Sequence, residues 1–417
     1  MRPIASARGK PGKFALVASA VVLGAAVVGA ISAAASAAPV SRQAATGSPT
    51  VTKEFFGNAF DSYANKDLPV YRYTLANGAG MQVRILTYGG DVQSINVPDR
   101  AGHSADVVLG FKTLNDYVTK DSPPVTANGG PYFGELIGRY ANRIAHGTFT
   151  LNGTTYHLPI NNNGNSLHGG LIGFGNHVWS AQEVKGNGTA GVALTIHSPD
   201  GDQGYPGNLT LTVTYTLNNA GQLGIHYHAS TDKPTVVNFT NHSYFNLAGE
   251  DTLDSYGQYV QINADHYTPT DATQIPTGQI APVAGTPFDF RTPHTIGSRI
   301  NESDPQLLIG QGYDHNWVLN NSGPTLDGLR FAALAWDPGS GRQLTVWTDQ
   351  PGVQFYTSNF LNGSLVGTSG HTYRQGAAYT FETQHYPDSP NHPSFPTTVL
   401  NPGQAFNSST IFQFGTH

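Results

Sequence analysis

Apolar and polar residues alternate along most of this chain, and a period of two predicts β-strands rather than helices. The pairs Asn77-Gly78 and Asn152-Gly153 each separate two alternating stretches, which is typical of β-hairpins. Helical periodicity is confined to short pieces near Leu114–Val118 and Ile296–Ile300. The pattern therefore predicts an all-β sandwich or barrel-like stack of sheets with few short helices. The clearest predicted strands are Val70–Ala76, Met81–Thr87, His146–Leu151, Thr154–Leu158, Gly191–Ile196, Leu209–Leu217, Leu223–His228, Phe331–Trp336 and Leu344–Thr348.

The N-terminus has the pattern of a secretory signal peptide. Four basic residues without a neighbouring acidic one precede the apolar and small-residue run Phe14–Ile31, and Ala35-Ser36-Ala37 offers an A-x-A cleavage site. The alternative is an uncleaved membrane anchor, since the run is nearly long enough to span a bilayer. We expect a signal peptide at 1–37, cleaved near Ala37, a flexible leader at 38–52 and a single domain at 53–417. The mature protein is then secreted and free of the membrane.

Composition excludes several classes of protein. Charged residues make up 12% and aromatic residues 11% of the 417 residues, and the aromatic content is too high for a disordered chain. The formal net charge of −6 disfavours a nucleic-acid binder, which normally carries a basic excess. The absence of cysteine excludes disulfides, thiolate metal sites and cysteine nucleophiles.

Candidate chemistry is concentrated in a few short polar clusters. Singly each has a plain structural explanation: Arg139 and Arg143 could form structural salt bridges, His168 could be a loop residue without a role, and His242 a satisfied core histidine. Together the clusters supply His, Glu, Asp, Arg, Asn and Gln beside aromatic residues, which is the chemistry that sugar hydroxyls require. The clusters lie at 138–144, 165–170, 240–247, 313–317, 351–356 and 381–384.

Glu382 follows the apolar and aromatic run Ala377–Phe381, so we expect burial to raise its pKa toward the range that suits a general acid or base. A metal site is not expected. His226 and His228 share one face of a predicted strand, but no third ligand follows at metal spacing. No glycine-rich phosphate loop and no nucleophile elbow occurs in the sequence.

In this order the clusters resemble the aldose 1-epimerase (galactose mutarotase) family. The similar motifs are A-N-R-I, N-S-L-H-G-G, N-H-S-Y-F-N-L, Y-D-H-N, P-G-V-Q-F-Y and E-T-Q, with flanking stretches at 106–111 and 200–207. The resemblance covers about residues 53–415. It implies a large antiparallel β-sandwich of the galactose-mutarotase type (a supersandwich). It also implies an isomerase that interconverts α and β anomers of free aldoses such as galactose and glucose without a cofactor.

The same resemblance implies roles for individual residues. His242 matches the general acid, Glu382 the general base and His168 a second active-site histidine. The only expected partner is a monosaccharide, and monomer and dimer are both open. The matched substrate-binding positions are Asn142, Arg143, Tyr244, Asp314 and Gln354. Arg139 falls outside them and is expected to be structural.

Three other functions remain open at this point. A secreted glycoside hydrolase would use Asp314 and Glu382 as its carboxylate pair. A non-catalytic carbohydrate-binding protein would bind sugar without accelerating anomer exchange. A phosphosugar epimerase would need a cationic phosphate pocket, which a secreted chain with few basic residues is poorly suited to build. The sequence does not determine whether galactose, glucose, xylose or arabinose is preferred.

Overall fold

The computed structural model of the protein describes residues 47–121, 130–186 and 188–417. The predicted signal peptide and residues 38–46 of the predicted leader lie outside the described residues. Within those ranges, no helix combines the length and the apolar character that crossing a membrane would require. Strands dominate and helices are few and short, so the predicted all-β fold class is confirmed.

The largest sheet has ten antiparallel strands in the order β11-β12-β13-β14-β31-β25-β24-β18-β21, and β23 pairs with β24. Alternation along β13 shows why it forms: Leu, Val and Tyr side chains are buried in the core, while Thr and Asn side chains lie on the opposite, partly exposed face. The strands are β11 (Ser180–Gly186), β12 (Thr189–Ser198), β13 (Leu209–Asn218), β14 (Gln222–Thr231), β18 (Tyr259–Ile262), β21 (His294–Thr295), β23 (Thr325–Leu326), β24 (Leu329–Trp336), β25 (Arg342–Thr348) and β31 (Phe406–Thr416).

A second sheet contains the first five strands in chain order. It corrects one boundary, because β1 begins at Thr50, inside the predicted flexible leader. Thr50 and Val51 pair with Ala76 and Leu75 of β2, and β-branched residues favour such a position. The strands are β1 (Thr50–Asp61), β2 (Lys66–Ala76), β3 (Gln82–Leu86), β4 (Val92–Pro98) and β5 (Ser104–Asp106).

The third sheet has six strands in the order β17-β29-β26-β22-β19-β20. Its central strands have two different faces, both buried. Phe381, Phe355 and Trp317 lie on the apolar face, whereas Glu382 and Gln354 alternate with them on the polar face. The strands are β17 (Tyr244–Phe245), β19 (His266–Thr268), β20 (Ala281–Pro282), β22 (Asp314–Val318), β26 (Gly352–Tyr356) and β29 (Tyr379–Gln384).

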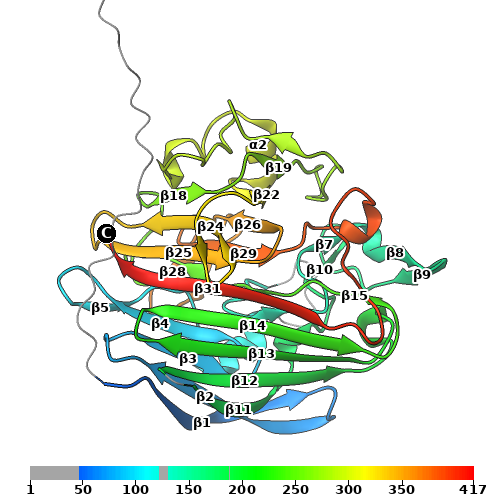
Figure 1. Ribbon diagram of the computed structural model, residues 1–417, viewed down its shortest axis with the longest axis horizontal. Coiled ribbons are helices and arrows are strands. Elements are labelled where there is room, and N and C mark those ends of the chain that lie inside the picture. Colours follow the sequence, from blue (N-terminus) through cyan, green and yellow to red (C-terminus); the bar gives the residue numbers. More distant parts are fainter. Residues whose placement is uncertain (1–46, 122–129, 187) are drawn as a thin grey trace, which may run out of the picture. The chain divides into compact units, whose positions relative to one another are not determined.

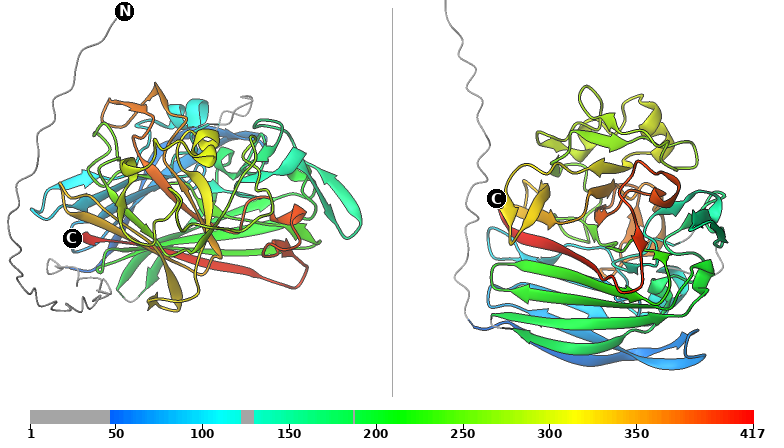
Figure 2. Two further views of the ribbon diagram at one scale, coloured as in Figure 1. Left: turned by 90° about the horizontal axis from the view of Figure 1, so that it is seen from above. Right: turned by 45° about the vertical axis from the view of Figure 1, so that its right-hand side comes forward.

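One apolar core joins the three sheets. Figures 1 and 2 show β12, β13 and β14 running alongside β1 to β4, and a single cluster of buried side chains draws on both sheets and on the apolar face of the third. This core supports the third sheet from one side and leaves its polar face for other residues. Short two-stranded pairs complete the β-structure: β6 (Leu136–Ile137) with β16 (Thr240–Asn241), β7 (Arg143–Ile144) with β10 (Ser166–Leu167), β8 (Thr148–Leu151) with β9 (Thr154–His157), β15 (Thr235–Val236) with β30 (Val399–Leu400), and β27 (Asn362–Val366) with β28 (Thr372–Arg374).

Both predicted hairpins are confirmed, because β2 pairs with β3 and β8 pairs with β9. Asn152 (φ 51°) and Gly153 (φ 80°) form a two-residue turn between β8 and β9, because these residue types tolerate positive φ. The turn between β2 and β3 is longer. The Asn77 side chain stabilises it by accepting hydrogen bonds from the peptide N–H groups of Ala79 and Met81.

Residues 235–240 contribute to two separate short strands, β15 and β16, which pair with different partners. Helix α2 (Pro305–Gly310) was not predicted, although Asp304 caps its N-terminus and Pro305 begins it. The two helical pieces that were predicted are α1 (Leu114–Asp116), which continues into a single π turn at Tyr117–Asp121, and a 3₁₀ turn at Ile296–Ser298. Further 3₁₀ turns lie at Ala145–Gly147, Phe174–Asn176, Asp202–Gly204 and Ser389–Asn391.

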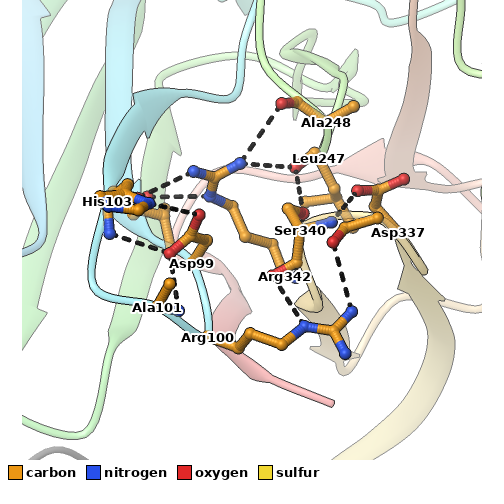
Figure 3. Close-up of polar contacts among 11 residues, drawn as sticks. Asp99, Arg100, Ala101, His103, Leu247, Ala248, Asp337, Ser340 and Arg342 are labelled. Carbon is orange, nitrogen blue, oxygen red and sulfur yellow. Dashed lines mark hydrogen bonds and ion pairs between the residues drawn. The ribbon is translucent and has the colours of Figure 1, made fainter.

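A buried arginine ties distant segments together. The guanidinium of Arg342, at the start of β25, donates hydrogen bonds of 2.9–3.3 Å to the carbonyl groups of Val97, His103, Leu247 and Ala248. Figure 3 shows these contacts beside the turn that joins β4 to β5. The carbonyl partners come from both the five-stranded sheet and the segment that follows β17, so this one side chain fixes them against β25.

Candidate active site

A cavity of about 650 Å³ is lined by residues of the third sheet and by loops from elsewhere in the chain. Seven of the eight residues predicted for the site line it, which brings together segments more than 200 residues apart in the sequence. The seven are Asn142, Arg143, His168, His242, Tyr244, Asp314 and Glu382. The eighth, Gln354, does not line the cavity but donates a hydrogen bond to Asp314, which does.

Strand pairing positions the residues of the third sheet. Glu382 on β29 is opposite Gln354 on β26, and Asp314 on β22 is opposite Tyr356 on the same strand β26. Because side chains alternate between faces, these four lie on the polar face together. Tyr244 on β17 is opposite Thr380, which lies two residues before Glu382 on β29 and therefore on the same face. The ring of Tyr244 is thus on the same side of the sheet as Glu382.

Glu382 and His242 are two ionisable groups in contact inside the cavity. The Oε1 atom of Glu382 lies 3.4 Å from Nε2 of His242 and accepts a hydrogen bond of 2.9 Å from the hydroxyl of Thr380. The second carboxylate oxygen, Oε2, is buried and has no hydrogen-bond partner among the described residues. A proton can therefore pass between the two side chains, and Oε2 has an acceptor position to offer a ligand.

Burial sets the protonation of this pair. It raises the pKa of Glu382 to about 8, helped by the negative charge of Asp314 and opposed by Thr380 and Arg143. Burial lowers the pKa of His242 to about 3, partly opposed by nearby backbone carbonyl groups. The raised pKa of Glu382 agrees with expectation. Between these values the pair holds one proton, and because burial disfavours both charged forms, that proton lies on Glu382 and both side chains are neutral.

The ring of His168 packs against the ring of His242, and a hydrogen bond from the backbone determines the tautomer of His168. The peptide N–H of Asn142 donates to Nδ1 of His168 at 3.2 Å, and the two imidazole rings are 5.1 Å apart between centroids. Burial lowers the pKa of His168 well below its usual value, and the charges of His242 and Arg143 add to this effect. The neutral ring therefore carries its proton on Nε2 and acts as a hydrogen-bond donor there.

His168, His242 and Glu382 are also the described residues whose potential metal-ligand atoms all lie within 4.8 Å of one another. The tautomer of His168 presents an N–H group rather than a lone pair on Nε2, and Nδ1 is already used by Asn142. The arrangement thus suits proton transfer and the binding of hydroxyl groups better than it suits a metal ion. His226 and His228, the other histidine pair considered, are exposed on β14 and hydrogen-bond to Ser409 and Asn407.

The charged hydroxyl-binding candidates, Arg143 and Asp314, are held by amide side chains. Arg143 donates from Nε to Asn162 at 3.0 Å and from Nη2 to Gln274 at 2.6 Å. Asp314 accepts from Gln274 at 2.6 Å and from Gln354 at 2.8 Å. Burial raises the pKa of Asp314, whereas Arg143 and the two amides lower it.

Gln354 does not line the cavity. Its side chain is buried, its Nε2 atom donates to Asp314 at 2.8 Å, and its Oε1 atom has no hydrogen-bond partner among the described residues. The geometry gives Gln354 a supporting contact to Asp314, and its role in substrate binding stays a prediction. Arg139, expected to be structural, is buried away from the cavity and donates to Ser198 and to the carbonyl groups of Pro199 and Pro206.

Sequence reasoning missed several residues that line the cavity. Tyr132 packs edge to face against His168 and, more distantly, against His242. Tyr356 stands two residues after Gln354 on one strand face, and alternation could have found it. Asn162 and Gln274 come from loops, and no motif in the sequence marks them.

Comparison with known proteins identifies the family. The family model described as "Aldose 1-epimerase" matches residues 71–413. Galactose mutarotase of Rattus norvegicus is 46% identical over 334 residues, which is 80% of this chain and 91% of the relative. Aldose 1-epimerase of Escherichia coli K12 is 39% identical over 349 residues, 83% of this chain and 95% of the relative.

Solved structures agree with this result. The crystal structure of galactose 1-epimerase from Lactobacillus acidophilus NCFM has a TM-score of 0.76 and 31% identity, over 89% of this chain and 100% of that one. An aldose epimerase homologue from C. elegans has a TM-score of 0.70 and 29% identity, over 81% and 96%. The protein belongs to the aldose 1-epimerase family, and the galactose-mutarotase type of β-sandwich is confirmed.

Proposed function

We propose that this protein is an aldose 1-epimerase, an isomerase that interconverts the α and β anomers of free aldoses such as galactose and glucose. The observation that carries the proposal is the contact of 3.4 Å between Glu382 and His242 inside a cavity lined by hydroxyl-binding side chains. A carboxylate and an imidazole in contact can remove one proton and deliver another in a single substrate. Family membership supports the same activity.

Ring opening needs two proton transfers. Glu382 removes the proton of the anomeric hydroxyl while the bond between C1 and the ring oxygen breaks, and the electron pair of that bond stays on the ring oxygen. His242 delivers a proton to the ring oxygen, so an open-chain aldehyde forms and the proton count balances. Rotation about the C1–C2 bond presents the other carbonyl face. The same two groups then act in reverse, and closure restores both protonation states.

The reactive form has the proton on His242 and a negative charge on Glu382. It contains the same number of protons as the neutral pair, in which the proton lies on Glu382. Transfer across the contact of 3.4 Å converts one form into the other without exchange with solvent. A sugar hydroxyl that donates to Oε2 of Glu382 favours the ionised carboxylate, so substrate binding supports the transfer.

The remaining residues bind and orient the sugar. His168 donates from Nε2 near the ring oxygen, and Arg143 and Asp314 bind hydroxyl groups at the far side of the ring as donor and acceptor. Tyr244 supplies an aromatic face beside His242, with the ring centroids 5.1 Å apart. Asn142 holds His168, and Gln354 holds Asp314.

Polarimetry of freshly dissolved α-anomers tests the proposal. We expect the protein to accelerate the change in optical rotation of galactose and glucose well beyond the spontaneous rate, and to release no sugar from aryl glycosides. Hydrolysis of an aryl glycoside would favour the hydrolase alternative, and sugar binding without faster anomer exchange would favour a binding protein.

We also propose that the protein is exported as one catalytic domain after removal of a signal peptide near Ala37. The basic, apolar and A-x-A segments of the N-terminus support this proposal. N-terminal sequencing of protein from the culture medium should begin near Ala38. An intact Met1 on membrane-associated protein would contradict cleavage.

A further inference from the structure

Gln274 connects the two charged hydroxyl-binding residues of the cavity. Its Oε1 atom accepts from Nη2 of Arg143 at 2.6 Å, and its Nε2 atom donates to Oδ2 of Asp314 at 2.6 Å. The side chain is only 6% exposed and lines the cavity. A guanidinium can only donate and a carboxylate can only accept, so the amide has a single orientation that satisfies both.

The backbone around Gln274 is held in the conformation that aims this side chain. Gln274 has φ 65°, in the left-handed region, where a residue other than glycine is uncommon. A turn formed by Asp271 supports it: the Asp271 carbonyl accepts from the peptide N–H of Gln274 at 2.9 Å, and its carboxylate accepts from those of Thr273 and Ile275. The amide therefore enters the cavity at a fixed position.

The amide separates two opposite charges that would otherwise attract each other strongly in a buried site. No ion pair within 4.0 Å joins Arg143 to Asp314 in the part of the chain that the structure describes. Without the amide, Arg143 and Asp314 could close into a direct ion pair. A sugar would then have to break that pair before either group could bind a hydroxyl.

We propose that Gln274 is a positioning residue that sets the spacing between Arg143 and Asp314 and thereby determines which aldoses the cavity prefers. Two hydroxyl groups of the sugar are recognised by a donor and an acceptor whose separation the amide fixes. Aldoses that differ in the orientation of one of these hydroxyls differ in how well they match that separation. This inference rests on the proposed function and adds a determinant of substrate choice.

The test compares Gln274→Leu with Gln311→Leu. Gln311 is a matched control because it is also a glutamine in the left-handed region (φ 54°), but its side chain is exposed. For Gln274→Leu we expect KM for the preferred aldose to rise about tenfold or more, since charge-assisted hydrogen bonds are disturbed. Selectivity among galactose, glucose, xylose and arabinose should narrow, and kcat should stay within about threefold because the contact between Glu382 and His242 is untouched.

A second variant adds a readout that a purely structural role would not move. Gln274→Glu places a carboxylate beside Asp314, whose charge already raises the pKa of Glu382. The basic limb of the pH profile should therefore shift to higher pH in Gln274→Glu and stay in place in Gln274→Leu. Unchanged KM and selectivity in a folded Gln274→Leu protein, or an unshifted basic limb in Gln274→Glu, would overturn the inference.

Binding of 1-deoxygalactose, measured by calorimetry, keeps this inference separate from the proposed function. This sugar has no anomeric hydroxyl and cannot react. Wild-type protein that binds it without accelerating mutarotation would refute the proposed function alone. Wild-type protein that is active, together with a Gln274→Leu variant that binds 1-deoxygalactose equally well, would refute the role of Gln274 alone.

Discussion

Replacement of Glu382 by Gln removes the base while keeping the shape of the side chain. The amide oxygen can still accept from Thr380, but the side chain can no longer take a proton from the anomeric hydroxyl or exchange one with His242 at 3.4 Å. General acid–base assistance is worth about 10²–10⁴-fold, which corresponds to about 3–5 kcal/mol of transition-state stabilisation. We therefore expect kcat to fall by that factor, while KM changes less, because Arg143 and Asp314 remain in place to bind the other hydroxyl groups of the sugar.

The assay is polarimetry of α-galactose and α-glucose, corrected for spontaneous mutarotation, on protein with confirmed native circular dichroism. Glu183→Gln is the matched control, because Glu183 is exposed on β11 and makes only a loose ion pair of 3.8 Å with Lys185. The control should retain wild-type activity. Activity of Glu382→Gln within a few-fold of wild type would remove Glu382 from the mechanism and direct the search to Asp314.

The same substitution has a predictable effect on stability. The pKa of Glu382 is raised to about 8 in the folded protein from 4.5, so the unfolded chain releases this proton at lower pH than the folded one. Stability from this group is fully present below about pH 4.5 and is lost as pH rises toward 8. At pH 7 the loss is on the order of 3 kcal/mol. Glu382→Gln avoids it, so its melting temperature should exceed that of wild type by a margin that grows from pH 5 to pH 8. A margin that shrinks over this range would contradict the buried, protonated state of Glu382.

Three further outcomes follow from the contacts described above. Arg143→Ala should raise KM strongly, because a charge-assisted donor to the sugar is lost, whereas Arg139→Lys should affect folding stability more than KM. Equal effects of Arg143→Lys and Arg139→Lys on KM would contradict the assignment of Arg143 to substrate binding and of Arg139 to a structural role. His242→Asn should lose activity as Glu382→Gln does, and the double variant should lose less than the product of the two single losses. The kcat/KM of the wild-type protein should fall above about pH 8, because the pair then loses its one proton. Arg342→Lys should lower the free energy of unfolding, measured in urea titrations, by about 2–4 kcal/mol, since an ammonium cannot bond to all four carbonyl groups. A change below about 0.5 kcal/mol would show that the hydrogen bonds of Arg342 in Figure 3 contribute little to stability.

The protonation of the acid–base pair is where structure changes the expectation most. The roles that the resemblance implies, a general base at Glu382 and a general acid at His242, require an ionised Glu382 beside a protonated His242. Deep burial of both groups favours the neutral pair instead, with the proton on Glu382. The basic limb then reports loss of the proton from Glu382, and the acidic limb reports a second proton on His242. Burial is a property of the packed structure, and no spacing of residues along the chain gives its extent.

Local patterns were enough to predict the fold class, and the motifs shared with the aldose 1-epimerase family indicated most of the residues that line the cavity. Alternation along Leu209–Leu217 predicts a strand with one buried face, because a period of two places its apolar side chains on one side. The pair Asn152-Gly153 predicts a tight turn, because these residues accept positive φ. Glu382 after an aromatic run predicts a buried carboxyl group with a raised pKa. Each of these properties depends on residues a few positions apart.

The tertiary structure alone decided which distant residues meet. Strand order β29-β26-β22 places Glu382, Gln354 and Asp314 side by side, although Glu382 and Asp314 lie 68 residues apart in the sequence. Gln274 reaches Arg143 and Asp314 from a loop whose sequence is ordinary turn chemistry. Contacts between segments far apart depend on register and loop path across the whole domain, and those are determined by the shared core rather than by any local pattern.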